Sequence, residues 1–265
     1  MQRQLIEYRN QGYSQSGEEG IVARIFDVLG INDGFCCEFG AWDGKHLSNT
    51  RALMEKGWRG LMIEADGERF VDLKKTYPPE SNAICLCEFV DANKNSLAQI
   101  AKRSGVGDRF DFLSIDIDGL DYEIFRSLDQ FEKAPLVVCV EAHTCHIADD
   151  EREVPPKQPG RDPGQPLGRY VKAGNEIGYR LVCFLGTNAF FIHGHAGHEN
   201  DLPTLSPLQA ALQNLELVKA SKFAREYLYR ANLGKEPPYH YFSNPLFSRT
   251  ALGISIPRAI WLYLS

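Results

Sequence analysis

Short apolar runs alternate with stretches of helical period along the first two thirds of the chain. Apolar residues spaced along one helix face predict a leading helix over residues 16–29, which Gly30 would end. The apolar runs predict five strands, at residues 35–39, 60–64, 83–89, 112–116 and 136–141. The helical patterns between them lie at residues 46–56, 68–76, 94–103 and 122–129. Near-continuous apolar strands separated by helices predict a parallel sheet with helices on both faces.

The pattern changes after the fifth strand. Residues 149–168 are rich in proline, glycine and charge, which predicts an exposed loop that is either a lid over a site or a mere linker. A helical stretch at 169–177 follows. The next two strands, 179–185 and 188–193, are joined by two residues, Gly186-Thr187, and therefore predict an antiparallel hairpin.

These elements predict an α/β domain over residues 1–200, with a leading helix and a seven-stranded, mostly parallel sheet that ends in an antiparallel hairpin. Residues 201–265 are expected to form a helical extension packed on the same domain. The composition, 43% hydrophobic and 24% charged, is typical of a soluble globular chain. The net charge of −6 disfavours a nucleic-acid partner, and no apolar run reaches the ~20 residues of a membrane span. We expect a cytoplasmic protein with reduced cysteines and a small-molecule partner, and homo-oligomerisation stays open.

An acidic, glycine-bearing turn follows the first predicted strand. Glu38 precedes Gly40 and Gly44, and glycines at a strand-to-helix turn allow a nucleoside ligand to lie against bare backbone. The spacing differs from the three-glycine pattern of dinucleotide sites, so it suits a cofactor without a pyrophosphate, such as S-adenosylmethionine. Glu64 ends the second strand, where a carboxylate can bind both ribose hydroxyls of adenosine. Asp91 follows the third strand, where we expect it to bind the adenine amino group.

Residues of metal-ligand type follow the fourth and fifth predicted strands. Strand alternation places Asp116 and Asp118 on one side, and likewise Glu141 and His143. Carboxylates with one imidazole suit a divalent ion such as Mg²⁺ or Mn²⁺, which would lower the pKa of a bound substrate hydroxyl. The candidate catalytic residues are Asp116, His143 and His146, with His143 the leading general base. The alternative is that the acids only cap helices and line a polar cleft.

Four segments carry a resemblance to a known family: residues 13–20 (YSQSGEEG), 38–44 (EFGAWDG), 48–50 (SNT) and 57–64 (GWRGLMIE). Together they resemble the FkbM-type branch of class I S-adenosylmethionine-dependent methyltransferases. The resemblance implies a Rossmann-like fold and the methylation of hydroxyl groups on sugars or natural products. It also implies that Gln15 and Ser16 close over the cofactor and that Asn49 lies on its methionine side. We expect Asp116 to contact the cofactor as well.

The acids after the fourth and fifth strands are similar to those that hold magnesium in metal-dependent O-methyltransferases. By this similarity, Asp116 and Glu141 would hold magnesium in this chain. Gly119 stands where that group carries a basic residue, so the general base stays open. We therefore expect S-adenosylmethionine-dependent, metal-assisted O-methylation of a sugar or natural-product hydroxyl. The alternatives are methylation of nitrogen or of a phosphorus-linked oxygen, and a non-catalytic nucleotide-sugar-binding protein. We expect the three tryptophans to pack in the core or the tail: Trp42, Trp58 and Trp261.

Overall fold

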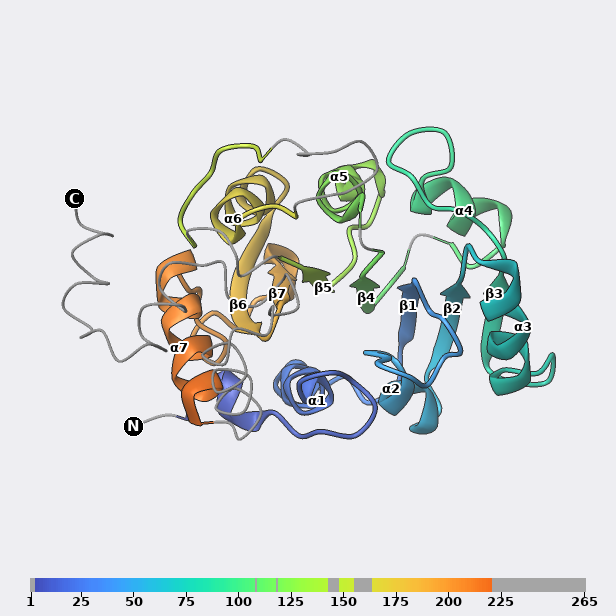
Figure 1. The fold of residues 1–265 in the computed structure, drawn as a ribbon, viewed down its shortest axis with the longest axis horizontal. Helices are drawn as coiled ribbons and strands as arrows, with labels where there is room; N and C mark the ends of the chain where they lie inside the picture. Colours follow the sequence, from blue (N-terminus) through green and yellow to red (C-terminus); the bar gives the residue numbers. More distant parts are fainter. Residues whose placement is uncertain (1–2, 108, 118, 143–147, 155–163, 221–265) are drawn as a thin grey trace, which may run out of the picture.

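The computed structural model describes residues 3–107, 109–117, 119–142, 148–154 and 164–220, with side chains described up to residue 214 of the last helix. Seven strands form one sheet in the order β3-β2-β1-β4-β5-β7-β6 (Figure 1). Their bounds are β1 Phe35–Phe39, β2 Arg59–Ile63, β3 Ala83–Leu86, β4 Phe112–Ile115, β5 Val137–Glu141, β6 Tyr179–Leu185 and β7 Asn188–His193. Strands β1 to β5 pair in parallel, whereas β7 is antiparallel to both β5 and β6. The predicted sheet of the class I methyltransferase fold, with its final hairpin, is confirmed.

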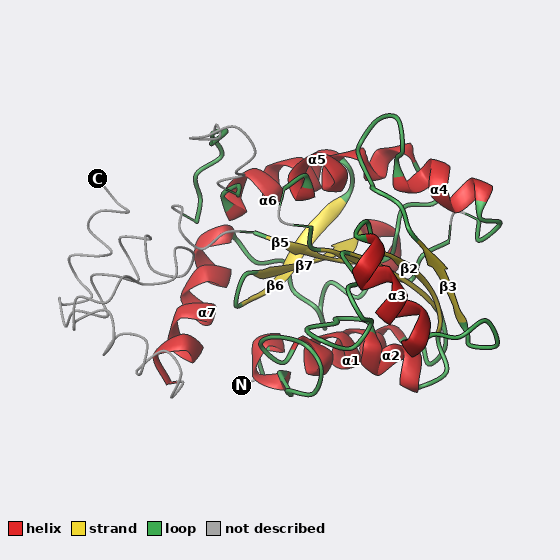
Figure 2. Ribbon diagram, turned by 45° about the vertical axis from the view of Figure 1, so that its right-hand side comes forward, coloured by secondary structure: helices red, strands yellow, loops and turns green. Residues whose placement is uncertain are grey.

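Helices cover both faces of this sheet, as Figure 2 shows. Their bounds are α1 Glu18–Leu29, α2 Arg51–Glu55, α3 Gly67–Thr76, α4 Leu97–Arg103, α5 Asp121–Arg126, α6 Leu167–Glu176 and α7 Pro207–Ala220, with 3₁₀ turns at Leu5–Tyr8, Ser127–Gln130 and Gly194–Ala196. Apolar residues of α1, α2 and α3 pack in one core layer, against strand residues such as Phe112 and Phe190. Residues of α4, α5 and α6 form the second layer, against Leu113 and Val138. The sheet is therefore buried on both faces, which explains its continuous apolar strands.

Three predicted elements are at least three residues shorter than the pattern indicated. The helix expected over 46–56 is formed only in α2, because residues 48–50 bond to the Glu38 carboxylate instead. The third strand ends at Leu86 rather than at residue 89. Helix α4 starts after Ser96, whose side chain accepts a hydrogen bond from the Gln99 backbone amide and whose own backbone amide donates to Gln99 Oε1.

The described part of the C-terminal extension packs on the same sheet. Ala210 of α7 is buried in the second core layer. The Asn214 side chain bonds to both backbone groups of Gly186 in the β6–β7 turn, at 2.8 and 2.9 Å. Of the seven cysteines, the six in the described residues are free thiols. Among the same residues, none of the helices has both the length and the apolar character that crossing a bilayer requires.

Candidate functional site

A cavity of about 420 Å³ lies at the carboxyl ends of β1, β2, β4 and β5. Open α/β sheets bind ligands at this edge, and the volume is within the usual range for small-molecule sites. Seven of the residues that the sequence singled out line it: Gln15, Glu38, Gly40, Asn49, Glu64, Asp116 and Glu141. These come from separate segments of the chain, so the fold brings together most of the predicted site.

Glu64 directly follows β2 and is 5% exposed. Its Oε2 atom accepts a hydrogen bond from the Trp42 amide at 2.8 Å, and its Oε1 atom accepts one from the Asp66 amide at 2.8 Å. A carboxylate has about four acceptor positions, so both oxygens keep a lone pair for a ligand. The two hydrogen bonds from backbone amides fix the orientation of the carboxylate in the cavity wall in the absence of a ligand.

Glu38, in β1, holds the turn between residues 48 and 50. Its Oε2 atom accepts hydrogen bonds from Ser48 Oγ at 2.6 Å and Thr50 Oγ1 at 2.7 Å, and its Oε1 atom accepts one from the Asn49 amide at 2.7 Å. Burial raises the pKa of Glu38, although these hydrogen bonds act in the opposite direction. The carboxyl group is thus used to position Asn49 in the cavity wall.

Asn49 is 4% exposed and carries an unusual unpaired atom. Its Nδ2 atom donates to Ser114 Oγ at 3.1 Å, whereas its buried Oδ1 atom accepts no hydrogen bond within the described part of the chain. Buried polar atoms without a partner are rare and costly in folded proteins. The carboxamide is therefore a candidate contact for a ligand that carries N–H or O–H donors.

Gly40 and Gly44 both have a left-handed backbone conformation, but different neighbours exclude a side chain at each position. Gly40 has φ +73°, and a Cβ there would overlap the backbone carbonyl oxygen of Asp116. Gly44 has φ +71°, and a Cβ there would meet the side chains of Tyr77 and Leu73. The sequence interpretation expected a ligand against both glycines. The structure places Gly40 in the cavity wall and packs Gly44 on α3 and the residues that follow it.

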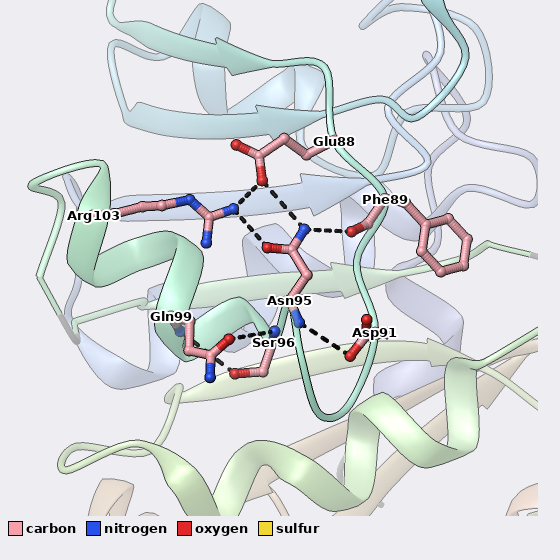
Figure 3. Close-up of polar contacts among 7 residues, drawn as sticks. All are labelled: Glu88, Phe89, Asp91, Asn95, Ser96, Gln99 and Arg103. Carbon is pink, nitrogen blue, oxygen red and sulfur yellow. Dashed lines mark hydrogen bonds and ion pairs between the residues drawn. The ribbon is translucent and has the colours of Figure 1, made fainter.

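Asp91 lies outside the residues that line the cavity. Its Oδ1 atom accepts hydrogen bonds from the amides of Asn93, Lys94 and Asn95, which shapes the turn before α4. Figure 3 shows the bond from Asn95. The acid that lines the cavity after β3 is Glu88. Glu88 Oε2 pairs with Arg103 and accepts from Asn95 Nδ2 at 3.2 Å, so the structure offers Glu88 where the sequence suggested Asp91.

Sequence reasoning missed the exposed apolar rim of the cavity. Trp42, Leu47 and Phe89 line it with exposures of 38%, 44% and 59%. Trp42 was expected in packing, and that expectation is wrong for Trp42 but correct for Trp58, which is 2% exposed. The Arg69 guanidinium lies 4.5 Å from the centre of the Trp42 ring. The available signal was position, because Trp42 closely follows one predicted strand and Phe89 is the last residue of another.

Asp116 and Glu141 line the same cavity at the ends of neighbouring strands. Ile115 and Val140 are paired in the β4–β5 register, so the two acids stand at adjacent strand ends. Asp118, His143 and His146 lie outside the described residues. Within the described ranges no group of three or more His, Cys, Asp or Glu side chains is placed to hold a metal. Ser16 does not line the cavity but lies against Gly186.

No family model matches the chain, and no curated protein matches it in sequence. The FkbM-type resemblance therefore stays a prediction. Among solved structures the chain is similar to a TehB-like SAM-dependent methyltransferase from Corynebacterium glutamicum, with 13% identity and a TM-score of 0.42 over 66% of this chain and 87% of that one. It is also similar to the N-terminal domain of EvdMO1 with SAH bound, with 15% identity and a TM-score of 0.44 over 70% and 81%.

A third similar structure is the putative methyltransferase yhhF from Escherichia coli, with 13% identity and a TM-score of 0.38 over 64% of this chain and 83% of that one. Each similarity has low identity and a TM-score below 0.5, so no function follows from it. The functional argument rests on the strand order and on the cavity.

Proposed function

We propose that the protein is an S-adenosylmethionine-dependent methyltransferase that acts on a small acceptor. The observation that carries this proposal is the Glu64 carboxylate. It directly follows β2 in a sheet of this strand order, is fixed by two backbone amides, and lines a cavity of small-molecule size. A fixed carboxylate with one free lone pair on each oxygen suits a vicinal diol such as that of ribose.

The residues present fit this cofactor in two further ways. The unpaired Oδ1 atom of Asn49 is an acceptor for the ammonium group of the methionine moiety. The exposed rings of Trp42 and Phe89 supply apolar surface for the base. S-adenosylmethionine, when bound, supplies a sulfonium methyl group that is open to in-line attack. The protein's part is to hold donor and acceptor in reach of each other and to exclude water.

For the acceptor we propose a hydroxyl group of a sugar or natural product. Asp116 and Glu141 would hold a divalent ion, Mg²⁺ or Mn²⁺, beside that hydroxyl. Mg²⁺ sites commonly use one or two carboxylates together with water and substrate oxygens, so these two acids fit the ion. The ion would lower the pKa of the hydroxyl. Asp118 and His143 as further ligands, and His143 or His146 as general base, belong to the same proposal.

Calorimetric titration with S-adenosylhomocysteine tests the donor site. We expect Glu64→Gln to weaken binding about 10- to 100-fold, because a hydrogen bond to a charged group contributes about 1.5–3 kcal/mol. The control is Glu80→Gln, a change of the same type at an exposed residue away from the cavity. Absence of binding to the wild-type protein would refute the proposal, and a nucleotide-sugar that bound instead would favour the non-catalytic alternative.

Chelation tests the metal separately. We expect EDTA to abolish transfer of a labelled methyl group to the acceptor and added Mg²⁺ or Mn²⁺ to restore it, while S-adenosylhomocysteine still binds. Full transfer in EDTA would exclude metal assistance and leave the donor site intact. Screening hydroxyl, amine and phosphate-bearing acceptors with the same label separates O-methylation from methylation of nitrogen or of a phosphorus-linked oxygen.

A further inference from the structure

Residues 10–17, which precede α1 on one side of the sheet, form a closed loop that we term the hook (Figure 1). The Asn10 amide donates to the Gly17 carbonyl at 3.0 Å, which joins the two ends of the hook. Glu19, in the first turn of α1, gathers four donors on one carboxylate. They are the amides of Gly12, Tyr13 and Ser14 and the hydroxyl of Ser14. The hook is therefore closed by its own hydrogen bonds in the absence of a ligand.

The hook contacts the rest of the domain at two places, a first arm at Tyr13 and a second arm at Ser16. On one side the Tyr13 hydroxyl donates to Glu55 Oε1 of α2 at 2.6 Å. On the other side Glu18 is fully buried; it accepts from the Ser16 amide at 2.7 Å and from Asn188 Nδ2 at 2.9 Å. Ser16 lies so near the β6–β7 turn that a Cβ on Gly186 would come within 2.7 Å of its Oγ atom.

These attachments place the second arm of the hook over the β5–β7 end of the site. Asn188, which binds Glu18, is the register partner of Glu141 across β5 and β7. Glu64 directly follows β2, on the other side of β1 and β4. With a strand spacing of about 4.8 Å, the strand ends that carry Glu64 and Glu141 are about 14 Å apart. The hook thus approaches the cavity from the end opposite the proposed ribose site.

Gln15 is the hook residue that reaches the cavity. It lines the cavity together with Asp116 and Glu141, is exposed, and makes no side-chain hydrogen bond to any described residue. A carboxamide provides one acceptor and two donors, which is the pairing that a hydroxyl group requires. A side chain carried on a fixed backbone loses less freedom when it binds, so the hook prepares Gln15 for recognition.

We propose that Gln15 orients the acceptor and does not close over the cofactor, with Glu18 and Glu19 as the residues that position it. This inference rests on the proposed methyltransferase function and assigns Gln15 to the acceptor end of the same cavity. The inference requires an acceptor that carries hydroxyl groups. Methyl glycosides of glucose, galactose and rhamnose are suitable probes.

The test compares the wild type with Gln15→Ala and with Gln11→Ala, a change of the same type at an exposed hook residue that does not line the cavity. S-adenosylhomocysteine affinity, measured by calorimetry, should stay within twofold in all three proteins. With the best methyl glycoside as acceptor, Gln15→Ala should raise KM at least tenfold, whereas Gln11→Ala should leave KM within twofold.

Three results would overturn the inference. A tenfold loss of S-adenosylhomocysteine affinity in Gln15→Ala would place Gln15 on the cofactor instead. An unchanged KM in Gln15→Ala would remove its role at the acceptor. Absence of methyl transfer to every glycoside by the wild type would leave Gln15 without a saccharide to orient. Failure of the wild type to bind S-adenosylhomocysteine is a different result, because it would refute the methyltransferase proposal itself.

Discussion

Replacement of Gly40 by alanine tests the close approach between the β1 turn and Asp116. Gly40 has φ +73°, and an added Cβ would lie under 3.0 Å from the Asp116 carbonyl oxygen and 3.3 Å from its carbonyl carbon. Gly30 is a matched control, because it has φ +67° and nothing within 4 Å of an added Cβ. The two positions share the backbone conformation and differ in the overlap.

The expected magnitudes follow from these two contributions. A left-handed conformation costs an L-residue about 1–2 kcal/mol, and this applies to both variants. Overlap with a backbone atom forces a shift that costs about 1–3 kcal/mol more. The free energy of unfolding should therefore fall by about 1–2 kcal/mol in Gly30→Ala and by about 2–5 kcal/mol in Gly40→Ala. Gly44→Ala should lie between them, because its nearest neighbours are side chains of Tyr77 and Leu73 that can yield.

Urea denaturation of the three variants and the wild type measures these differences, with the slope m checked for two-state behaviour. Gly40→Ala should also weaken S-adenosylhomocysteine binding, since Asp116 must move within the cavity wall. The reasoning fails if Gly40→Ala is no less stable than Gly30→Ala, because the overlap with the carbonyl would then have no energetic weight.

Two further predictions concern the same cavity. Because burial raises the pKa of Glu38 above its ordinary 4.5, the stability that Glu38 contributes is complete below pH 4.5 and is lost as pH rises through the folded-state pKa. Glu38→Gln should flatten that decline in urea denaturation as pH rises above 4.5, and parallel curves for the two proteins would contradict the assignment. Trp42, which is 38% exposed and lines the cavity, should change its fluorescence when S-adenosylhomocysteine binds. Of the two tryptophans in the described residues Trp58 is buried, so Trp42→Phe should remove most of that change, and an undiminished signal would show that Trp42 does not meet the ligand.

The sequence predicted the interior of the fold well, because buried helices and strands require apolar residues at a regular spacing or in continuous runs. The bounds of β1, β6 and β7 agree with the predicted residues, and α1 ends at Gly30 as expected. Strand ends placed Glu64, Asp116 and Glu141 correctly at one edge, since parallel strands all end on the same side.

The parts that could not be predicted depend on side chains that bond to backbone far away in sequence or within a turn. Glu38 draws residues 48–50 out of the expected helix across 10 to 12 residues of sequence. Asp91 has the position of a ligand-binding acid but bonds to three amides of its own turn, which no periodicity records. The exposed apolar rim was missed because large apolar residues are expected in the core unless the structure shows otherwise.

The two hydrogen bonds between the Asn214 side chain and the Gly186 backbone determine what a truncation of the chain before α7 would cost. Both backbone groups of Gly186 are buried and depend on one side chain of α7 for their hydrogen bonds. A chain cut before Pro207, although it keeps every strand, would lose both of these hydrogen bonds, at a cost of about 0.5–1.5 kcal/mol each. The loss would fall on the turn that abuts Ser16, so removing α7 would loosen the hook, which lies far from α7 in sequence, where it meets the cavity.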